Sequence, residues 1–197
     1  MPNLTDAFYK LTKNVKTGQY IETGTYLGNG IKDVLNNYDT VHSIELSAHW
    51  FDHNVEQFKN NKNVQMHLGD SKEVLPVLLD SIYEPVTIFL DAHYSGKPTA
   101  FGQEETPLLH ELAMLQQRGF DDIIIIDDCR LLGKTGSCGI SDNHPVYPTM
   151  TYDWSGVTET EIKKRMKPGY VLLKNDKKIF SDGQYDQYIL VKVSAPI

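Results

Sequence analysis

The sequence has little cysteine and no excess of positive charge, and both shortages narrow the class of protein. Its 197 residues include only two cysteines, Cys129 and Cys138, which are too few for a disulfide framework or a cysteine-rich zinc site. We therefore expect a reducing compartment, the cytoplasm. The net charge of -7 gives no overall positive field to attract nucleic acid, so we expect no nucleic-acid partner.

Long apolar runs are missing as well. Because no stretch of 18 apolar residues occurs, we expect no membrane-spanning helix and a soluble protein. The first residues lack the charged and apolar segments of a signal peptide. With 40% hydrophobic residues, residues 1–197 are expected to form a single domain with its own core. The sequence leaves open whether this domain was excised from a larger glycan-modifying protein, and whether it forms a homodimer.

Short apolar segments alternate with segments of helical periodicity in the first two thirds of the chain. We expect strands at 20–22, 41–45, 64–68, 86–90 and 123–127, and helices at 30–37, 48–59, 71–81 and 105–118. The segments 86–90 and 123–126 are apolar throughout, which is typical of parallel strands covered on both faces. The alternation predicts a doubly wound parallel sheet.

The last third of the chain has a different pattern. A helix is expected at 158–166, followed by strands at 170–173 and 187–193. The segment that joins these two strands is too short for a crossover helix, so we expect them to be antiparallel. Two long loops, 94–103 and 130–156, are rich in glycine, proline and tyrosine. Loops of this length at the ligand edge of a sheet are often lids or substrate caps.

The segment from Tyr20 to Gly30 combines a strand, the acidic residue Glu22 and three glycines. Glycines allow a ligand to lie against bare backbone, and the start of the following helix offers unpaired N–H groups. The spacing differs from the dinucleotide motif G-x-G-x-x-G, and an acid at Glu22 would repel a pyrophosphate. The turn therefore favours a cationic ligand such as S-adenosylmethionine.

The expected parallel strands end on or near acidic residues. These residues are Glu22, Glu45, Asp70, Asp91 and the pair Asp127–Asp128. Any one of them has a simpler explanation as a turn residue or helix cap. Because ligands bind at the carboxyl ends of the strands in such sheets, the whole series is expected to converge on one ligand crevice.

The first acids of the series suit a nucleoside. Glu45 follows the glycine turn by about twenty residues, where a carboxylate can bind two ribose hydroxyls. Asp70 either receives the adenine amine or caps the helix that begins at Ser71. The residues expected to contact S-adenosylmethionine, or its product S-adenosylhomocysteine, are Glu22, Thr23, Gly24, Thr25, Gly28, Gly30, Glu45, Leu46, Gly69, Asp70, Ser71 and Asp91.

The remaining acids, Asp91, Asp127 and Asp128, suit a divalent cation. Three carboxylates at close range repel one another unless a counterion is present. Ligands that are all oxygen favour Mg²⁺, Mn²⁺ or Ca²⁺ over zinc. The alternative is that one aspartate caps a helix and another pairs with Arg130.

His93 lies two residues after Asp91, beside the expected metal site. It is interpreted as a general base, as a metal ligand, or as a loop residue without a chemical role. The aromatic residues of the two long loops either stack on a sugar or pack the loops; they are Tyr94, Tyr147, Tyr152 and Trp154. Glu104 and Glu105 are interpreted as the first residues of a helix.

These features together resemble the Rossmann-like (class I) S-adenosylmethionine-dependent methyltransferases: the acid–glycine turn, Glu45, Gly69-Asp70 and the closing hairpin. Asp91 with Asp127–Asp128 further resembles the metal-dependent sugar O-methyltransferases, whose proposed base lies just past the first metal aspartate, here His93. The chain departs from the catechol-type enzymes, which have a lysine where this sequence has Tyr94. Its glycine motif is also wider than the common form.

The resemblance implies an α/β fold with a doubly wound, mostly parallel seven-stranded Rossmann-like sheet, helices on both faces and a C-terminal antiparallel hairpin. It implies transfer of a methyl group from S-adenosylmethionine to a hydroxyl of a small molecule or glycan, a rhamnose-like diol being favoured. The catalytic residues would be His93 and Asp91, with Mg²⁺ or Mn²⁺ on Asp91, Asp127 and Asp128.

Three other functions are considered. The first is a methyltransferase that needs no metal, or one that acts on a catechol, a phenol or nitrogen. The second is a nicotinamide oxidoreductase, which Glu22 and the C-terminal hairpin disfavour. The third is a domain that binds the cofactor or a glycan without catalysis.

Overall fold

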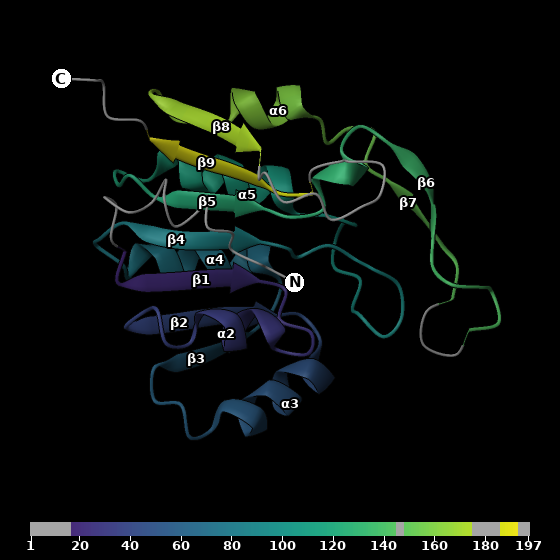
Figure 1. Cartoon of the computed structure of the whole chain (residues 1–197), viewed down its shortest axis with the longest axis horizontal. Helices are drawn as coiled ribbons and strands as arrows, with labels where there is room; N and C mark the ends of the chain where they lie inside the picture. The colour runs from purple at the N-terminus through teal and green to yellow at the C-terminus, as the bar shows by residue number, and fades with distance from the viewer. Residues whose placement is uncertain (1–16, 145–147, 175–185, 193–197) are drawn as a thin grey trace.

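The computed structural model describes residues 17–144, 148–174 and 186–192. Its main feature is a seven-stranded sheet in the order β3-β2-β1-β4-β5-β9-β8 (Figure 1). The strands are β1 Gln19–Thr23, β2 Thr40–Glu45, β3 Val64–Leu68, β4 Val86–Leu90, β5 Ile123–Ile126, β8 Tyr170–Lys174 and β9 Tyr188–Lys192. Strands β1 to β5 are parallel, and β9 is antiparallel to both β5 and β8.

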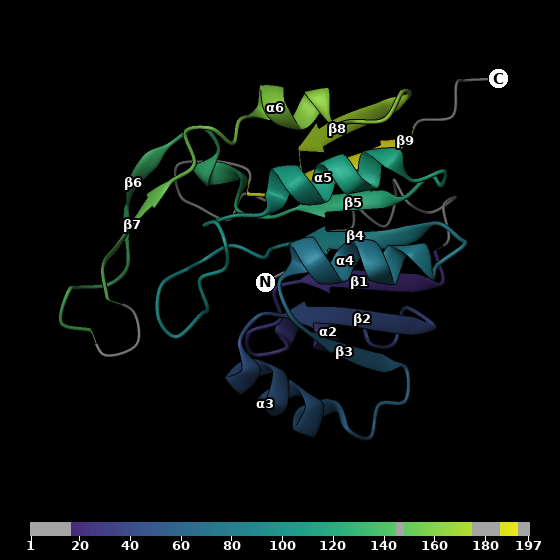
Figure 2. The ribbon, with the colours of Figure 1, turned by 180° about the vertical axis from the view of Figure 1, so that it is seen from behind.

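The two faces of this sheet are covered by different helices. Helices α2 Asn29–Val34 and α3 Ala48–Phe58 pack on one face, where Ile31, Val34 and Phe58 join the buried side chains of the strands. Helices α4 Ser71–Asp80, α5 Leu108–Gln117 and α6 Glu159–Lys164 pack on the other. Figure 2 shows α4 and α5 in front of the sheet. The expected fold class, including the C-terminal antiparallel hairpin, is confirmed.

The long loop 130–156 contains structure that the sequence did not predict. A short 3-10 helix, η1 Cys129–Leu131, is followed by an antiparallel hairpin of β6 Thr135–Cys138 and β7 Met150–Asp153. The hairpin projects beyond the carboxyl ends of the parallel strands (Figure 1). Because β6 is exposed at every position and consists of Thr-Gly-Ser-Cys, it has no alternation of apolar and polar residues to indicate a strand.

The other differences from expectation concern the ends of elements. Helix α5 begins at Leu108 rather than at residue 105, after Pro107, and β5 ends at Ile126. Tyr147 and the last residue of the expected strand 187–193 lie outside the described residues. Among the helices that the structure describes, none has the length and apolar character needed to cross a membrane.

Candidate functional site

A cavity of about 750 Å³ lies where the parallel strands end. Its volume is typical of a site for a small molecule or cofactor. Most of the residues expected at the site line it: Glu22, Gly24, Thr25, Gly30, Glu45, Leu46, Gly69, Asp70, Ser71, Asp91, His93, Asp127 and Asp128. Of the described residues expected there, Thr23 and Gly28 do not line it. The sequence therefore predicted residues from segments far apart in the chain that meet at one cavity.

The turn after β1 requires glycine at its first position. Gly24 has a φ of +87°, and a side chain there would place its Cβ 2.5 Å from the carbonyl oxygen of Asp91. Its N–H donates to the carbonyl of Ile44 at 2.9 Å. The ends of β1, β2 and β4 are thus held together at this point, and the floor of the cavity is bare backbone.

Glu22 is buried beneath the glycine turn. Ser43 donates to its Oε1 at 2.6 Å, and a Cβ at Gly30 would lie 2.2 Å from its Oε2. Burial raises the pKa of Glu22 to about 8, because the ionised form loses its hydration. The sequence interpretation took Glu22 as a charged group. The raised pKa instead favours the protonated form of the side chain in the free protein.

Glu45, at the end of β2, organises the same turn. Its Oε2 accepts the backbone N–H groups of Thr25 at 3.1 Å and Tyr26 at 2.9 Å, and its Oε1 accepts that of Ser47 at 2.8 Å. A carboxylate has about four lone-pair positions, so these bonds leave little free capacity. A bidentate contact with ribose would therefore require the two oxygens to be shared between the ligand and the turn.

Asp70 acts as the N-cap of α4, as one of its two interpretations predicted. Its Oδ1 accepts the N–H of Lys72 at 3.0 Å. Its Oδ2 faces Gly102, where a Cβ would lie 3.0 Å away. Because Asp70 also lines the cavity, capping leaves the second oxygen turned toward the loop 94–103.

The loop 94–103 forms a wall of the cavity. The indole N–H of Trp50, on α3, donates to the carbonyl of Pro98 at 3.1 Å, and the ring of Trp50 packs edge-on against Tyr26 at 4.7 Å. The ring of Tyr94 packs edge-on against Phe101 at 5.1 Å. These contacts hold the loop over the space between α3 and the glycine turn, where a lid was predicted.

His93 lies between two carboxylates at the ends of β4 and β5. Its Nδ1 is 3.2 Å from Oδ1 of Asp91, and its Nε2 is 2.9 Å from Oδ2 of Asp128. The hydroxyl of Ser95 is 2.7 Å from the same Nε2. A neutral imidazole can donate to only one of the two carboxylates, whereas an imidazolium donates to both.

Asp127 and Asp128 are adjacent in sequence but have different surroundings. Burial, and after it the charge of Asp91, raises the pKa of Asp127 to about 7. Asp128 forms an ion pair with Arg130, as the alternative to metal binding predicted. Arg130 also binds Asp186, with Nη1 2.8 Å and 2.7 Å from its two carboxylate oxygens.

Asp186 was missed by the sequence interpretation. The expected acids all followed parallel strands, whereas Asp186 precedes β9. Because β9 is antiparallel to β5, its beginning lies at the edge where β5 ends. An acid before the closing strand was therefore the signal that could have indicated it.

This cluster has the composition of a cation site. In the part of the chain that the structure describes, the ligand atoms of Asp91, His93 and Asp128 all lie within 4.8 Å of one another, and Asp127 is not part of this group. The carboxylates of Asp91, Asp128 and Asp186 contact one guanidinium and one imidazole, and Asp127 lines the same cavity. The excess of negative charge and the oxygen and nitrogen donors fit a divalent cation.

Glu105 connects the β6–β7 hairpin to the loop that carries His93. Its Oε1 accepts the indole N–H of Trp154 at 3.2 Å, its Oε2 accepts the N–H of Asp153 at 3.0 Å, and its carbonyl accepts the N–H of Tyr94 at 2.8 Å. The buried ring of Trp154 packs edge-on against His93 at 5.5 Å. Trp154 is thus a packing residue, and Glu105 is not a helix-start residue.

No family model matches the sequence, and no curated protein matches it either. Solved structures do match. A proposed O-methyltransferase from Klebsiella pneumoniae has a TM-score of 0.56 at 19% identity, covering 99% of this chain and 81% of that one. A proposed rRNA methylase from Clostridium thermocellum has a TM-score of 0.59 at 10% identity, covering 98% and 99%.

A third match is CalS10, an amino pentose methyltransferase from Micromonospora echinaspora solved with bound S-adenosylmethionine. Its TM-score is 0.55 at 9% identity, and the match covers 95% of this chain and 89% of that one. At these identities the likeness shows the fold, which is that of the class I S-adenosylmethionine-dependent methyltransferases. The names of these proteins describe different acceptors, so the fold does not indicate the acceptor.

Proposed function

We propose that this chain, which has the fold of the S-adenosylmethionine-dependent methyltransferases, is an O-methyltransferase assisted by a divalent cation. The observation that supports this most is the position of the Asp91–His93–Asp128 cluster on the wall of the large cavity at the strand ends. A cofactor site and a cation site are thus combined in one space. The cofactor supplies the methyl group that is transferred.

The cofactor would be held by the glycine turn and the ends of β2 and β3. The bare backbone at Gly24 permits close approach of its methionine end, and Glu45 offers acceptors to its ribose. Asp70 presents Oδ2 to the side of the cavity where the adenine would lie. Glu22, which is protonated in the free protein, would ionise when a sulfonium binds near it, because a positive charge favours the carboxylate.

Asp91 and Asp128 would hold the cation, with Asp127 close by. When bound, Mg²⁺ or Mn²⁺ would lower the pKa of an acceptor hydroxyl and fix its position. Arg130 would then keep Asp186 as its partner. Asp127 would add negative charge behind the site without a direct bond.

His93 would remove the hydroxyl proton, the role that its position beside Asp91 predicted. Trp154 and Ser95 restrict the orientation of its ring. Such proton transfer typically contributes about 10²–10⁴-fold to a rate. A sugar with two neighbouring hydroxyls suits this arrangement, since one oxygen can be oriented by the site while the other reacts.

The decisive experiment measures S-adenosylhomocysteine release from S-adenosylmethionine with glycosides and catechols, in Mg²⁺ and in EDTA. We expect turnover on a glycoside that EDTA abolishes and Mg²⁺ restores. Asp128→Asn should remove turnover while leaving S-adenosylhomocysteine affinity within about twofold, because Asp128 lies outside the nucleoside part of the cavity. An equal loss of turnover and of S-adenosylhomocysteine affinity would contradict this division of roles.

A methyltransferase that needs no metal is the second candidate. The ion pair between Asp128 and Arg130 favours it, because that contact neutralises part of the cluster without a cation. Turnover that persists in EDTA would support this function and remove the metal role from Asp91 and Asp128.

A further inference from the structure

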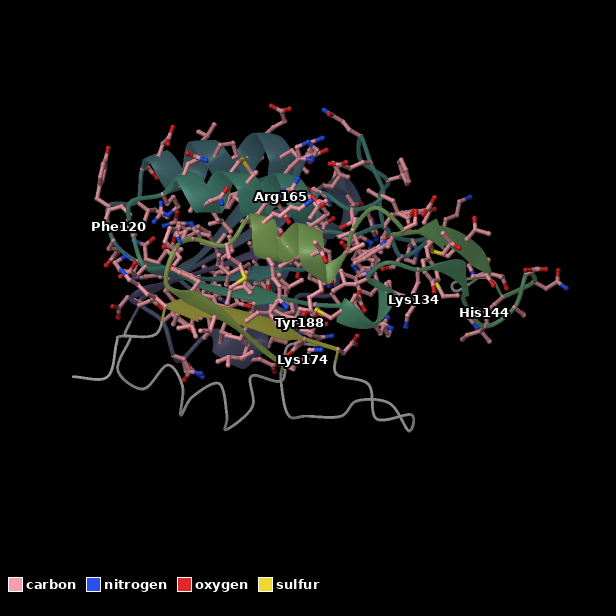
Figure 3. All side chains as sticks on the ribbon, turned by 90° about the horizontal axis from the view of Figure 1, so that it is seen from above. Phe120, Lys134, His144, Arg165, Lys174 and Tyr188 are labelled. Atoms are coloured by element: carbon pink, nitrogen blue, oxygen red, sulfur yellow. The ribbon has the colours of Figure 1, made fainter. Side chains whose placement is uncertain are left out.

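Helix α5 carries a single acid, Glu111, and its side chain faces the interior of the protein. Glu111 is 1% exposed and shares the buried face of α5 with leucines such as Leu112 and Leu115. Figure 2 shows α5 between α4 and α6, and Figure 3 shows these helices from the side of α6, whose end carries Arg165. Because a buried carboxyl loses its hydration, it lowers stability unless other groups compensate. Packing alone therefore does not explain Glu111.

The carboxyl of Glu111 lies behind two segments of the main cavity at the strand ends. Burial raises the pKa of Glu111 to about 7, and the nearby hydroxyls of Ser71 and Thr23 oppose this rise. Thr23 ends β1, and its Oγ1 accepts the N–H of Asp91 at 3.3 Å. Ser71 is the first residue of α4. Since Ser71 and Asp91 line the cavity, Glu111 supports its wall from behind at both places.

Two buried polar atoms lie close together here without forming a hydrogen bond. Oε1 of Glu111 and Oγ of Ser71 are both shielded from solvent, and neither has a partner among the residues that the structure describes. Buried polar atoms are nearly always hydrogen-bonded, because an unmade bond costs free energy. A hydroxyl can donate to a carboxyl oxygen, so a small shift of the start of α4 would pair the two groups.

A ligand in the cavity acts directly on the start of α4. Asp70 and Ser71 both line the cavity, on the side where the adenine would lie. Because Oδ1 of Asp70 accepts the N–H of Lys72 at 3.0 Å, a contact made by Asp70 is passed to the first turn of the helix. Glu111 belongs to α5, which is anchored by its buried leucines. Ligand binding can therefore move Ser71 relative to Glu111.

We propose that Glu111 is a positioning residue for the cofactor: when S-adenosylmethionine or S-adenosylhomocysteine binds, the hydroxyl of Ser71 donates to Oε1 of Glu111 and fixes the start of α4 against the adenine. This hydrogen bond is present in the bound protein and absent from the free one. Glu111 touches no reacting atom and acts through Ser71. The proposal rests on the proposed function, because it requires the cofactor in this cavity.

The test is a double-mutant cycle on the full chain, with Ser71→Ala, Glu111→Leu and the double variant. Calorimetry gives the affinity for S-adenosylhomocysteine, and urea unfolding gives the stability of the ligand-free protein. We expect each single change to weaken binding about tenfold, and the double change to weaken it less than about twentyfold, because both remove the same bond. In the ligand-free protein the two changes should add, since the atoms are unpaired there.

Two variants serve as controls. Glu111→Gln keeps the size of the side chain and one acceptor oxygen, so its affinity for S-adenosylhomocysteine should stay within about threefold of the wild type. Glu73→Gln makes the same chemical change on the exposed side of the first turn of α4. Its affinity should be unchanged.

Three results would overturn the proposal. The first is a pair of independent losses that multiply to about a hundredfold, because Ser71 would then contact the cofactor directly. The second is an equally large coupling in the unfolding of the ligand-free protein, because the contact would then be permanent. The third, which holds even if Glu111→Leu does not fold, is a loss below twofold in Ser71→Ala alone. A wild-type protein that binds no S-adenosylhomocysteine would overturn the proposed function as well.

Discussion

Glu45 holds the turn that forms part of the main cavity. Its carboxylate accepts three backbone N–H groups and lies against the cavity. Glu45→Gln replaces one acceptor oxygen by a donor that cannot receive those bonds. Because hydrogen bonds to charged groups contribute about 1.5–3 kcal/mol, we expect affinity for S-adenosylhomocysteine to fall by roughly ten- to hundredfold in calorimetric titration.

The matched control for this change is Glu56→Gln, on the exposed side of α3, where the carboxylate pairs with Lys59. That variant should bind with unchanged affinity. If Glu45→Gln binds as tightly as the control, Glu45 has no role in forming the cofactor cavity.

A substitution at His93 tests whether this residue acts as a general base or as a metal ligand. His93→Gln keeps a polar side chain between Asp91 and Asp128 but removes the proton acceptor. We expect kcat to fall by about 10²–10⁴-fold, with Mg²⁺ affinity, measured by titration, changed by less than threefold. A parallel loss of Mg²⁺ affinity would instead make His93 a ligand, the alternative that its distances to both aspartates also permit.

For single residues, the sequence predicted which side chains lie at the site better than it predicted their protonation and their hydrogen bonds. Acids after parallel strands converge because the topology brings the strand ends together. The proton on Glu22 depends on how deeply it is buried, and the bonds of Glu45 depend on the path of the turn. Neither property follows from residue type and spacing.

Glu105 joins the β6–β7 hairpin to the loop that carries His93. Trp154→Phe removes the indole N–H that Glu105 accepts while keeping an aromatic ring against His93. We expect the base of the hairpin to loosen, so that trypsin cleaves after Lys134 several times faster and kcat falls about tenfold. The affinity for S-adenosylhomocysteine should be unchanged, because the hairpin lies away from the nucleoside part of the cavity.

A loss of cofactor affinity equal to the loss of kcat would show general unfolding rather than a positioning role for Trp154. Tyr152→Phe, in the same hairpin, is the comparison that leaves the contacts of Glu105 intact.

Elements with strong patterns were predicted closely, and elements held by single contacts were not. The expected strands 64–68 and 86–90 coincide with β3 and β4. Strands β6 and β7 are exposed or half-exposed and are tied to the sheet by contacts such as those of Glu105. Because β6 carries no buried face, its sequence has no periodicity that could reveal it. In β7 the residues alternate between half-buried and exposed, but over four residues only.

For the whole molecule, buried titratable groups predict how stability changes with pH. Burial raises the pKa of Glu22 to about 8 and that of Glu111 to about 7. Because the folded state holds these protons more tightly than the unfolded state, both groups stabilise the fold at pH values below 4.5. Their contribution to the free energy of unfolding is lost as the pH rises through 7 to 8. Burial, with the charge of His67, lowers the pKa of His42 to about 4, so its contribution is present above pH 6.5 and lost as pH falls to 4.

Below pH 6.5 the contributions of the two acids and of His42 to stability change in opposite directions. Above pH 6.5, of these three groups, only Glu22 and Glu111 still change their contribution. We therefore expect the Tm of the ligand-free protein to fall between pH 6.5 and pH 8.5, measured by calorimetry. The double variant Glu22→Gln, Glu111→Gln should have a flatter profile over that range. A wild-type Tm that is constant or rises there would contradict the assignment of neutral, buried acids.

The parallel part of the sheet was predictable because strand and helix alternate along the chain. The antiparallel pairing of β8 with β9 was predictable because the segment between them is short. Arg130 entered the sequence interpretation as the partner of one aspartate, whereas its second partner, Asp186, did not.

The position of β9 has a consequence for the order of events during synthesis. Among the strands that the structure describes, β8 pairs only with β9, and β9 joins β8 to β5. While a ribosome is still making residues 175–187, β8 therefore has no native strand to pair with, and the outer edge of β5 is open. Asp186, the partner of Arg130, is also still missing. A chain emerging at about 5–20 residues per second thus completes its sheet and its acidic cluster in the same late step, and a chaperone that shields the edge of β5 would act in that interval.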